Sequence, residues 1–250
     1  MGRFLYKESP NLTVMLQCQT PEVAIGRIRN ALPLGADAFG LQAESLLPEH
    51  QNRETYERLF KEMKGKPAYV TNYHACSNKG KTDEELAEGL LLLAESGAAL
   101  CDVPGHLFGP HPLQMTEDPE AIRKQTALID AIHERGSEVL MSAHTNCFLS
   151  GDRVLELALE QKRRGADIIK IVTNAADRQE QMENLKTAER LRRELGAPYL
   201  FLSGGESSLL RHLGIRLGCC MALCVYEHDA LSTPAQPLLS VMKQLSQFTF

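Results

Sequence analysis

The stretch "RRGADIIKIVTN", Arg163 to Asn174, places a single lysine inside a run of aliphatic residues. Its Gly-Ala-Asp segment is typical of a helix end followed by a turn. The β-branched run from Ile168 to Val172 predicts a buried parallel strand. Because side chains alternate along a strand, Ile168, Lys170 and Val172 share one face. A buried lysine is costly unless something compensates for it, so Lys170 needs an electrostatic or a catalytic reason to be there.

Short apolar runs and longer amphipathic runs alternate along the whole chain. Strands are predicted at Leu12–Cys18, Ala38–Ala43, Ala68–Tyr73, Ala99–Val103, Glu138–Ala143, Ile168–Thr173, Tyr199–Ser203 and Cys219–Val225. Helices are predicted at Pro21–Ala31, Gln51–Lys64, Asp83–Ser96, Pro119–Arg135, Asp152–Arg164, Arg178–Leu195, Glu206–Leu217 and Gln236–Gln247. The fourth helix is predicted to have Asp118 as its N-cap and to end before Gly136.

Eight strands that alternate with eight helices predict an α/β fold, the (β/α)₈ TIM barrel, as a single domain over residues 1–250. A doubly wound open sheet is the alternative architecture. Against it, the first β–α turn, "LQCQTPEVA", lacks a GxGxxG phosphate loop, and the sequence contains no Walker motif.

Composition narrows the class of protein further. A length of 250 residues is normal for one α/β barrel, and a net charge of −5 without basic blocks argues against nucleic acid as a partner. No apolar run is long enough to cross a membrane, and "MGRFLYKESPN" lacks the apolar core of a signal peptide. The seven cysteines are odd in number and contain no CxxC pair, which favours reduced thiols in a cytoplasmic protein.

Two residues at neighbouring strand ends favour a specific chemistry. Lys170 would point into the barrel mouth, where low polarity favours the neutral amine. A neutral amine attacks a ketone to form a Schiff base, which then withdraws electrons from the adjacent carbon. His144, in "SEVLMSAHTNCF", ends the preceding strand, and a histidine moves protons near neutral pH. Taken singly, Lys170 could pair with a carboxylate and His144 could cap a turn, but the pair favours catalysis.

Four motifs, in chain order, resemble those of the type I 3-dehydroquinate dehydratase family, whose fold is a (β/α)₈ barrel. The family's fifth strand, S-Y-H-D-F, is matched by Ser142-Ala143-His144-Thr145-Asn146, and its sixth, G-A-D-I-V-K-I-A, by residues 165–172. Its S-R-x-x-G-x-x-F-G-S motif is matched by residues 210–219, and its lid, S-A-P-G-Q, by Ser232-Thr233-Pro234-Ala235-Gln236. The sixth-strand and S-x-H matches are the specific ones.

The resemblance implies a carbon–oxygen lyase, a hydro-lyase of the shikimate pathway of aromatic amino acid biosynthesis, with no cofactor and no metal. Lys170 would form the imine with a cyclic or small keto acid. His144 would remove the proton from the adjacent carbon and help water to leave. Arg211 would bind the substrate carboxylate through its planar guanidinium. Ser232 and Gln236 would close over the substrate from the lid.

Several of the family's binding residues are replaced in this chain. The family has E-x-R on its second strand, where this chain has Gly40 and Gln42, with Glu44 two residues on. The family's third-strand arginine is matched by Tyr73, and its first-strand serine by Met15. Its fourth-strand D-x-E is matched by Asp102 and Pro104, so the aspartate is kept and the glutamate is lost. We expect Asp102 to orient His144 in place of the missing glutamate, and Gln42 and Tyr73 to line the substrate site. A site built to bind a hydroxylated ring does not tolerate such losses, so we expect weak or no turnover of 3-dehydroquinate itself.

Other functions stay open. A Schiff-base aldolase uses a similar G-A-D-x-x-K strand, because retro-aldol cleavage needs the same electron sink. A non-catalytic homologue that binds a metabolite would tolerate the loss of the fourth-strand glutamate. Histidines and carboxylates could also hold zinc or manganese, and the candidates are His74, His106, His111, His144, Asp102 and Glu44. The sequence leaves the oligomeric state open, and a homodimer is compatible with it.

Overall fold

Strands and helices alternate in the computed structural model, which describes residues 3–205 and 208–247. The strands are β1 (Asn11–Leu16), β2 (Ala38–Gln42), β3 (Ala68–Thr71), β4 (Leu100–Pro104), β5 (Glu138–His144), β6 (Ile168–Ala175), β7 (Tyr199–Gly205) and β8 (Met221–Cys224). The helices are α1 (Pro21–Ala31), α2 (Arg53–Glu62), α3 (Asp83–Glu95), α4 (Pro119–Glu134), α5 (Gly151–Arg163), α6 (Arg178–Glu194), α7 (Leu209–Leu213) and α8 (Leu239–Gln247). Short 3₁₀ turns are η1 (Ala43–Ser45), η2 (Pro48–His50), η3 (Cys76–Asn78) and η4 (Gly214–Arg216).

The strand order identifies the fold. The strands form one sheet in the order β7-β6-β5-β4-β3-β2-β1-β8, and β1–β2, β2–β3, β3–β4, β5–β6 and β6–β7 are parallel pairs. A doubly wound sheet reverses its strand order at a switch point. Here each strand follows its chain neighbour, and β8 lies beside β1. The predicted (β/α)₈ barrel is therefore confirmed, and the open-sheet alternative is wrong.

The chain divides into two compact units. The first unit comprises Met1–Asp102, Asp130–Glu138 and Leu223–Phe250, and the second comprises Val103–Ile129 and Val139–Ala222. Each unit contains segments that are distant in the sequence. The assignment of residues 1–250 to a single domain stays a prediction.

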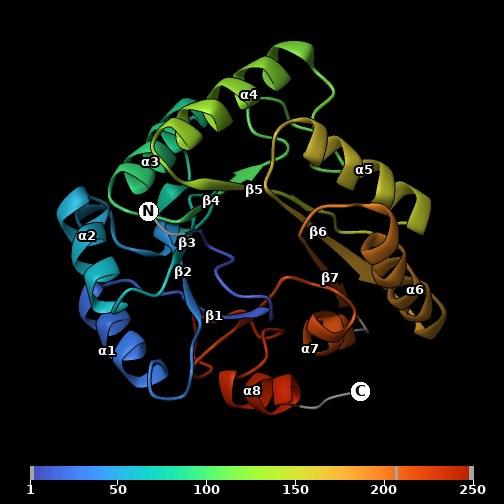
Figure 1. The fold of residues 1–250 in the computed structure, drawn as a ribbon. Coiled ribbons are helices and arrows are strands. Elements are labelled where there is room, and N and C mark those ends of the chain that lie inside the picture. The colour runs from blue at the N-terminus through green and yellow to red at the C-terminus, as the bar shows by residue number, and fades with distance from the viewer. Residues whose placement is uncertain (1–2, 206–207, 248–250) are drawn as a thin grey trace. The chain divides into compact units, whose positions relative to one another are not determined.

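In the first unit, helices α1 and α2 pack against each other and lie beside strands β1 and β2 (Figure 1). Phe4, ahead of β1, is fully buried, and its ring meets that of Tyr69 on β3 edge-on, with 6.4 Å between ring centroids. The Phe4 N–H donates to Glu138 Oε2 at 2.7 Å, and the Asn11 side-chain amide donates to the Phe4 carbonyl at 2.7 Å. The segment before β1 is thus held at the amino ends of the strands.

In the second unit, helices α5 and α6 cover β6 and β7 (Figure 1). The apolar residues Ile169, Ile171 and Phe201 are each 1% exposed. Along the second half of β6, Val172 and Asn174 are partly exposed, whereas residues 171, 173 and 175 are buried. The face of β6 that carries residue 170 therefore opens toward the carboxyl end of the strand.

The predicted boundaries of α4 illustrate the local rules. The Asp118 carboxylate accepts a hydrogen bond from the Glu120 N–H at 3.1 Å, as an N-cap does. Beyond the helix, Gly136 has φ +79°, the left-handed conformation that ends many helices. Among the described residues, no helix combines the length and the apolar character that a membrane span requires.

The last two predicted helices are shorter than expected. Of the predicted Glu206–Leu217, helix α7 covers only Leu209–Leu213, because the chain tightens into the 3₁₀ turn η4 at Gly214. Its predicted start, Glu206, lies outside the described residues. Helix α8 begins at Leu239 rather than at Gln236, since the Val225 N–H donates to the Pro237 carbonyl at 2.9 Å and the Leu239 N–H donates to the Val225 carbonyl at 2.8 Å.

Candidate active site

Lys170 and His144 lie on neighbouring strands of the second unit and face the same way. Strands β5 and β6 pair in parallel with Ser142 opposite Lys170 and His144 opposite Val172. Residues opposite each other in a parallel pair present their side chains to the same face. Lys170 is 4% exposed and His144 is partly exposed. The two residues predicted to carry the chemistry are therefore brought together, with His144 nearer the carboxyl end.

A buried glutamine holds the backbone of Lys170. Gln161, on α5, is fully buried. Its side-chain Oε1 accepts from the Lys170 N–H at 3.2 Å, and its Nε2 donates to the Lys170 carbonyl at 3.2 Å. Both backbone polar groups of the lysine are thus bound by one side chain. Gln161 was not predicted from the sequence, because a glutamine in an amphipathic helix has the same pattern whether it is exposed or buried.

The loop between β4 and α4 reaches the backbone of His144. The Gln114 side-chain Oε1 accepts from the His144 N–H at 3.0 Å, and Gln114 itself has φ +52°. The Gly105 N–H donates to the Ser142 carbonyl at 2.7 Å. A left-handed backbone at a residue other than glycine is strained and persists only where the surroundings enforce it. This loop is therefore fixed against the strand that carries the histidine.

A buried polar network of side chains from α4 and from the end of α5 holds the loop between β4 and α4. The Gln125 amide donates to the carbonyls of Gly105 and Leu107 at 2.9 and 2.8 Å. Arg164 donates to Gln125 Oε1 at 2.8 Å and to the Thr116 carbonyl at 2.6 Å. Gln125 is fully buried and Arg164 is 5% exposed. The side-chain donors of Gln125 and Arg164 are thus hydrogen-bonded to acceptors in the interior, and these bonds rigidify the loop between β4 and α4.

In the first unit, Asp102 on β4 is fully buried and is bound by two phenols. The hydroxyls of Tyr69 and Tyr73 each donate to Asp102 Oδ2 at 2.5 Å. Burial and the nearby Asp102 charge both raise the pKa of Tyr69 well above its ordinary value. Tyr73 thus lies at the strand ends, as predicted, whereas Tyr69 was missed as an ordinary apolar strand residue. The orientation of His144 by Asp102 stays a prediction.

Glu44 forms a second buried carboxylate in this unit. It is 2% exposed, and the Thr71 hydroxyl lies 2.9 and 3.0 Å from its two oxygens. Burial raises the pKa of Glu44 to about 7, and the Asp102 charge adds to this, although hydrogen bonds from Thr71 and from backbone N–H groups oppose it. Gln42 ends β2 opposite Thr71 and is partly exposed. Tyr69, Thr71 and Tyr73 occur at alternate positions along β3 and its end, so their side chains share one face of the strand. That alternation of hydroxyl-bearing residues is the sequence signal that could have identified the polar face around Glu44 and Asp102.

The replacements at Met15 and Gly40 are physically linked through Tyr69. A Cβ atom built on Gly40 would overlap the Met15 sulfur and would lie 3.1 Å from Tyr69 Cδ1. Met15 and Tyr69 thus fill the space that a side chain at position 40 would need. The absence of a side chain there allows the Tyr69 ring to lie where its hydroxyl meets Asp102.

Arg211 lies on α7 of the second unit and is partly exposed. Burial lowers the pKa of its guanidinium. Its Nε is buried, and among residues 3–205 and 208–247 no group accepts a hydrogen bond from it. A guanidinium in this state suits an incoming anion.

The predicted lid residues lie between β8 and α8 of the first unit. The Ser232 hydroxyl accepts from the Asp229 N–H at 2.9 Å, and Gln236 is 5% exposed. The Gln17 amide donates to the Thr233 hydroxyl at 2.9 Å, and the Thr233 N–H donates to Gln17 Oε1 at 3.1 Å. The lid segment is therefore fastened to the end of β1 through Gln17, a residue that was not predicted from the sequence.

The metal-binding alternative requires several ligands to converge. The part of the chain that the structure describes contains no group of three or more His, Cys, Asp or Glu side chains with metal-binding geometry. His74 instead lies 2.7 Å from Asp83 Oδ1, and the ring of His111 accepts from the Leu113 N–H at 3.2 Å. These two histidines thus have other partners.

Comparison with known proteins identifies the family. The family model described as Type I 3-dehydroquinase matches residues 12–250, so the chain belongs to the type I 3-dehydroquinase family. It is accordingly a carbon–oxygen lyase of the hydro-lyase class. No curated protein matches the sequence.

Solved structures share the fold at low sequence identity. The 3-dehydroquinate dehydratase from Geobacillus kaustophilus HTA426 is 16% identical, with a TM-score of 0.81 over 96% of this chain and 90% of that chain. The type I enzyme from Clostridium difficile, solved with covalently modified comenic acid, is 14% identical, with a TM-score of 0.79 over 96% and 92%. The deoxyribose phosphate aldolase from Aeropyrum pernix is 17% identical, with a TM-score of 0.60 over 95% and 89%. At these identities the likeness concerns the fold.

Proposed function

We propose that this enzyme eliminates water from a keto acid through a Schiff base on Lys170, with His144 as the general acid and base. The observation that carries the proposal is the pairing of β5 and β6. It places a buried lysine and a partly exposed histidine on one face of adjacent strands. A buried amine and a group that titrates near neutral pH are what imine chemistry needs.

The proposed reaction follows from these two groups. The Lys170 amine attacks the substrate ketone, and loss of water leaves a protonated imine. His144 removes a proton from the adjacent carbon, and the electron pair moves toward the imine nitrogen. The electrons then return to expel the hydroxyl on the next carbon, which leaves as water with the proton from His144. Hydrolysis of the imine releases the conjugated product and restores Lys170.

Substrate binding is proposed to depend on Arg211 and on the lid. The partly buried guanidinium of Arg211 has an Nε without an acceptor among the residues described, which supports its role as the anchor for a carboxylate. Ser232 and Gln236 would cover the substrate, and Gln42 and Tyr73 would line its site. Asp102 would orient His144.

The substrate is proposed to be a keto acid other than 3-dehydroquinate. Met15 and Tyr69 fill the space beside Gly40, and the two tyrosine hydroxyls bind Asp102. By the family resemblance, Gly40, Gln42, Tyr73 and Pro104 stand where the family has charged side chains that bind a hydroxylated ring. A site that lacks partners for hydroxyl groups binds a hydroxylated ligand poorly, because desolvated hydroxyls are left unpaired.

Borohydride trapping tests the lysine directly. The protein is incubated with sodium borohydride and, in turn, 3-dehydroquinate, comenic acid and a panel of small keto acids, and adducts are mapped by mass spectrometry. We expect a reduced adduct on Lys170 with at least one compound, and none in Lys170→Met that remains folded by circular dichroism. An adduct on a different lysine would contradict the assignment. The absence of any adduct across the panel would favour a non-catalytic homologue.

Turnover of 3-dehydroquinate tests the substrate. Formation of the conjugated enone is followed by ultraviolet absorbance, and we expect kcat/KM well below about 10⁴ M⁻¹s⁻¹, the lower end of ordinary enzyme efficiency. A value at or above that level would show that the replaced residues do not change the substrate.

A further inference from the structure

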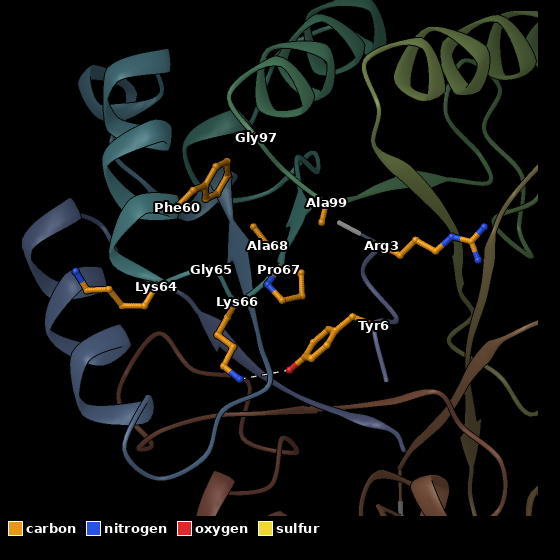
Figure 2. A pocket seen from close by; sticks show the side chains of 10 residues that line it. All are labelled: Arg3, Tyr6, Phe60, Lys64, Gly65, Lys66, Pro67, Ala68, Gly97 and Ala99. Carbon is orange, nitrogen blue, oxygen red and sulfur yellow. Dashed lines mark hydrogen bonds between the residues drawn. The ribbon is translucent and has the colours of Figure 1, made fainter. Parts of the chain in front are cut away.

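A hollow of about 550 Å³ lies in the first unit, at the amino ends of two strands (Figure 2). Its floor includes Ala68, the first residue of β3, and Ala99, which directly precedes β4. Catalytic groups of a (β/α)₈ barrel lie at the carboxyl ends of the strands. The hollow is therefore at the opposite end of β3 from Tyr73, which follows the carboxyl end of that strand.

The side chains around this hollow carry one sign of charge. Arg3, Lys64 and Lys66 line it, together with the aromatic rings of Tyr6 and Phe60, and no lining residue is acidic (Figure 2). Within residues 3–205 and 208–247, none of these three cations forms an ion pair. The whole chain has a net charge of −5, so this is a local concentration of positive charge.

Another hollow shows that this lining is not a general property of the surface. A hollow of about 850 Å³ at the start of α6 in the second unit is lined by both signs of charge. Its charged residues are Asp177, Arg178, Glu180, Glu183 and Lys186. Neighbouring charges of opposite sign compensate each other there, whereas the lining of the β3–β4 hollow supplies no counter-charge.

The wall that carries Tyr6 is held in place. The neighbouring Phe4 is fully buried and bonded through its N–H, and the Tyr6 hydroxyl donates to the Asp37 carbonyl at 3.2 Å. Lys66 Nζ lies 3.4 Å from the Tyr6 hydroxyl oxygen and 5.7 Å from the centre of its ring. A ligand would thus meet a prearranged ring and cation, which lowers the entropic cost of binding.

The opposite wall keeps a lysine in an unfavourable backbone conformation. Lys64 has φ +53° directly before Gly65, which has φ +81°. A left-handed conformation costs a residue other than glycine roughly 1 kcal/mol or more. A lysine there also suits the negative end of the α2 dipole. The lysine therefore places positive charge at the edge of the hollow despite its backbone strain.

We infer that this hollow binds a small organic anion that carries a flat ring, such as an aromatic carboxylate or an aryl phosphate. The anionic group would be held by Lys66, whose ammonium group lies beside Tyr6, and the ring would lie against the aromatic side chains of the hollow. Lys64 and Arg3 extend away from each other at its edges and would add positive charge around it (Figure 2). Guanidinium and ammonium groups bind phosphate and carboxylate through charge-assisted hydrogen bonds, and aromatic side chains supply the apolar contact. This site is independent of the imine chemistry.

Calorimetric titration of the 250-residue protein tests the inference with three probes: phenyl phosphate, inorganic phosphate and phenol. We expect phenyl phosphate to bind with a Kd of about 1 mM or lower, and each of the other probes at least roughly tenfold more weakly, because each lacks one half of the ligand. Lys66→Gln should weaken phenyl phosphate binding about fivefold or more. Lys61→Gln, which changes an exposed lysine of α2 outside the hollow, is the control and should leave it unchanged.

Three results would overturn the inference. One is a lack of saturable binding, and another is equal affinity for phosphate and phenyl phosphate, which would reveal a charged patch that makes no use of the rings. The third is an unchanged Kd in Lys66→Gln, which would place the probe elsewhere on the protein. Tyrosine fluorescence gives a second readout, since the chain has no tryptophan and Tyr6 lies in the hollow.

Discussion

Replacement of Gln161 by methionine is predicted to loosen the strand that carries Lys170. Methionine has a similar length and flexibility but offers no amide. The change removes two hydrogen bonds of 3.2 Å to the Lys170 backbone. A hydrogen bond contributes about 0.5–1.5 kcal/mol net, so we expect the free energy of unfolding to fall by about 1–3 kcal/mol.

Thermal unfolding measures this change. A loss of 1 kcal/mol lowers the melting temperature of a chain of this size by roughly 2–4 °C, which predicts a decrease of about 2–12 °C for Gln161→Met. The same variant should form the borohydride-trapped adduct more slowly than the wild type, because the lysine backbone is held less firmly. An unchanged melting temperature would refute the view that this amide fixes the strand.

A matched control separates local from general destabilisation. Asn11 is also fully buried, and its amide donates to the Phe4 carbonyl at 2.7 Å, at the amino end of β1. We expect Asn11→Leu to lower the melting temperature without changing the rate of adduct formation at Lys170. If both variants slow adduct formation equally, the effect of Gln161 is not specific to the lysine.

The remaining predictions concern an anion anchor and a buried acid. Arg211→Lys should weaken binding of the natural substrate by roughly 1–3 kcal/mol through loss of a bidentate pair, as measured by calorimetry or by KM, and unchanged affinity would place the carboxylate elsewhere. Folding raises the pKa of Glu44 from its ordinary 4.5 to about 7, so its protonated form is favoured in the folded state. Its contribution to stability is therefore fully present below pH 4.5 and is lost as the pH rises through about 7, by up to about 3 kcal/mol. Glu44→Gln should flatten the pH dependence of the free energy of unfolding in denaturant titrations, and an identical pH profile would contradict the raised pKa.

The architecture could be predicted because it depends on local patterns. The β-branched run Ile168–Val172 and the helix signals at Asp118 and Gly136 can be recognised from neighbouring residues in the sequence. The shared face of His144 and Lys170 follows from strand order and alternation alone. The length of α8 could not be predicted this way, because the pairing of Val225 with the segment around Pro237 competes with the helix.

The residues that support the site were missed for a different reason. Gln161 and Gln114 act through the backbones of Lys170 and His144, so their roles depend on which loop or helix lies against which strand. Nothing in their own sequence neighbourhood distinguishes them from solvated polar residues. Tyr69 has the residue type of a core strand and only its hydroxyl contact with Asp102 separates it from one.

Asp102 shows that a residue can match a family motif and still have different partners in the folded protein. Asp102 matches the family motif, but here its carboxylate is bound by Tyr69 and Tyr73. Tyr69 can lie there because position 40 is glycine, and Met15 fills the rest of that space. Met15, Gly40, Tyr69 and Asp102 therefore form one packed group. A comparison of the sequence with the family motif one position at a time does not reveal that these residues depend on one another. The proposed role of Lys170 depends on the alternation of side chains along β6, whereas the proposed change of substrate depends on this packed group. We therefore propose that the imine chemistry of the family is retained in this chain and that its substrate differs.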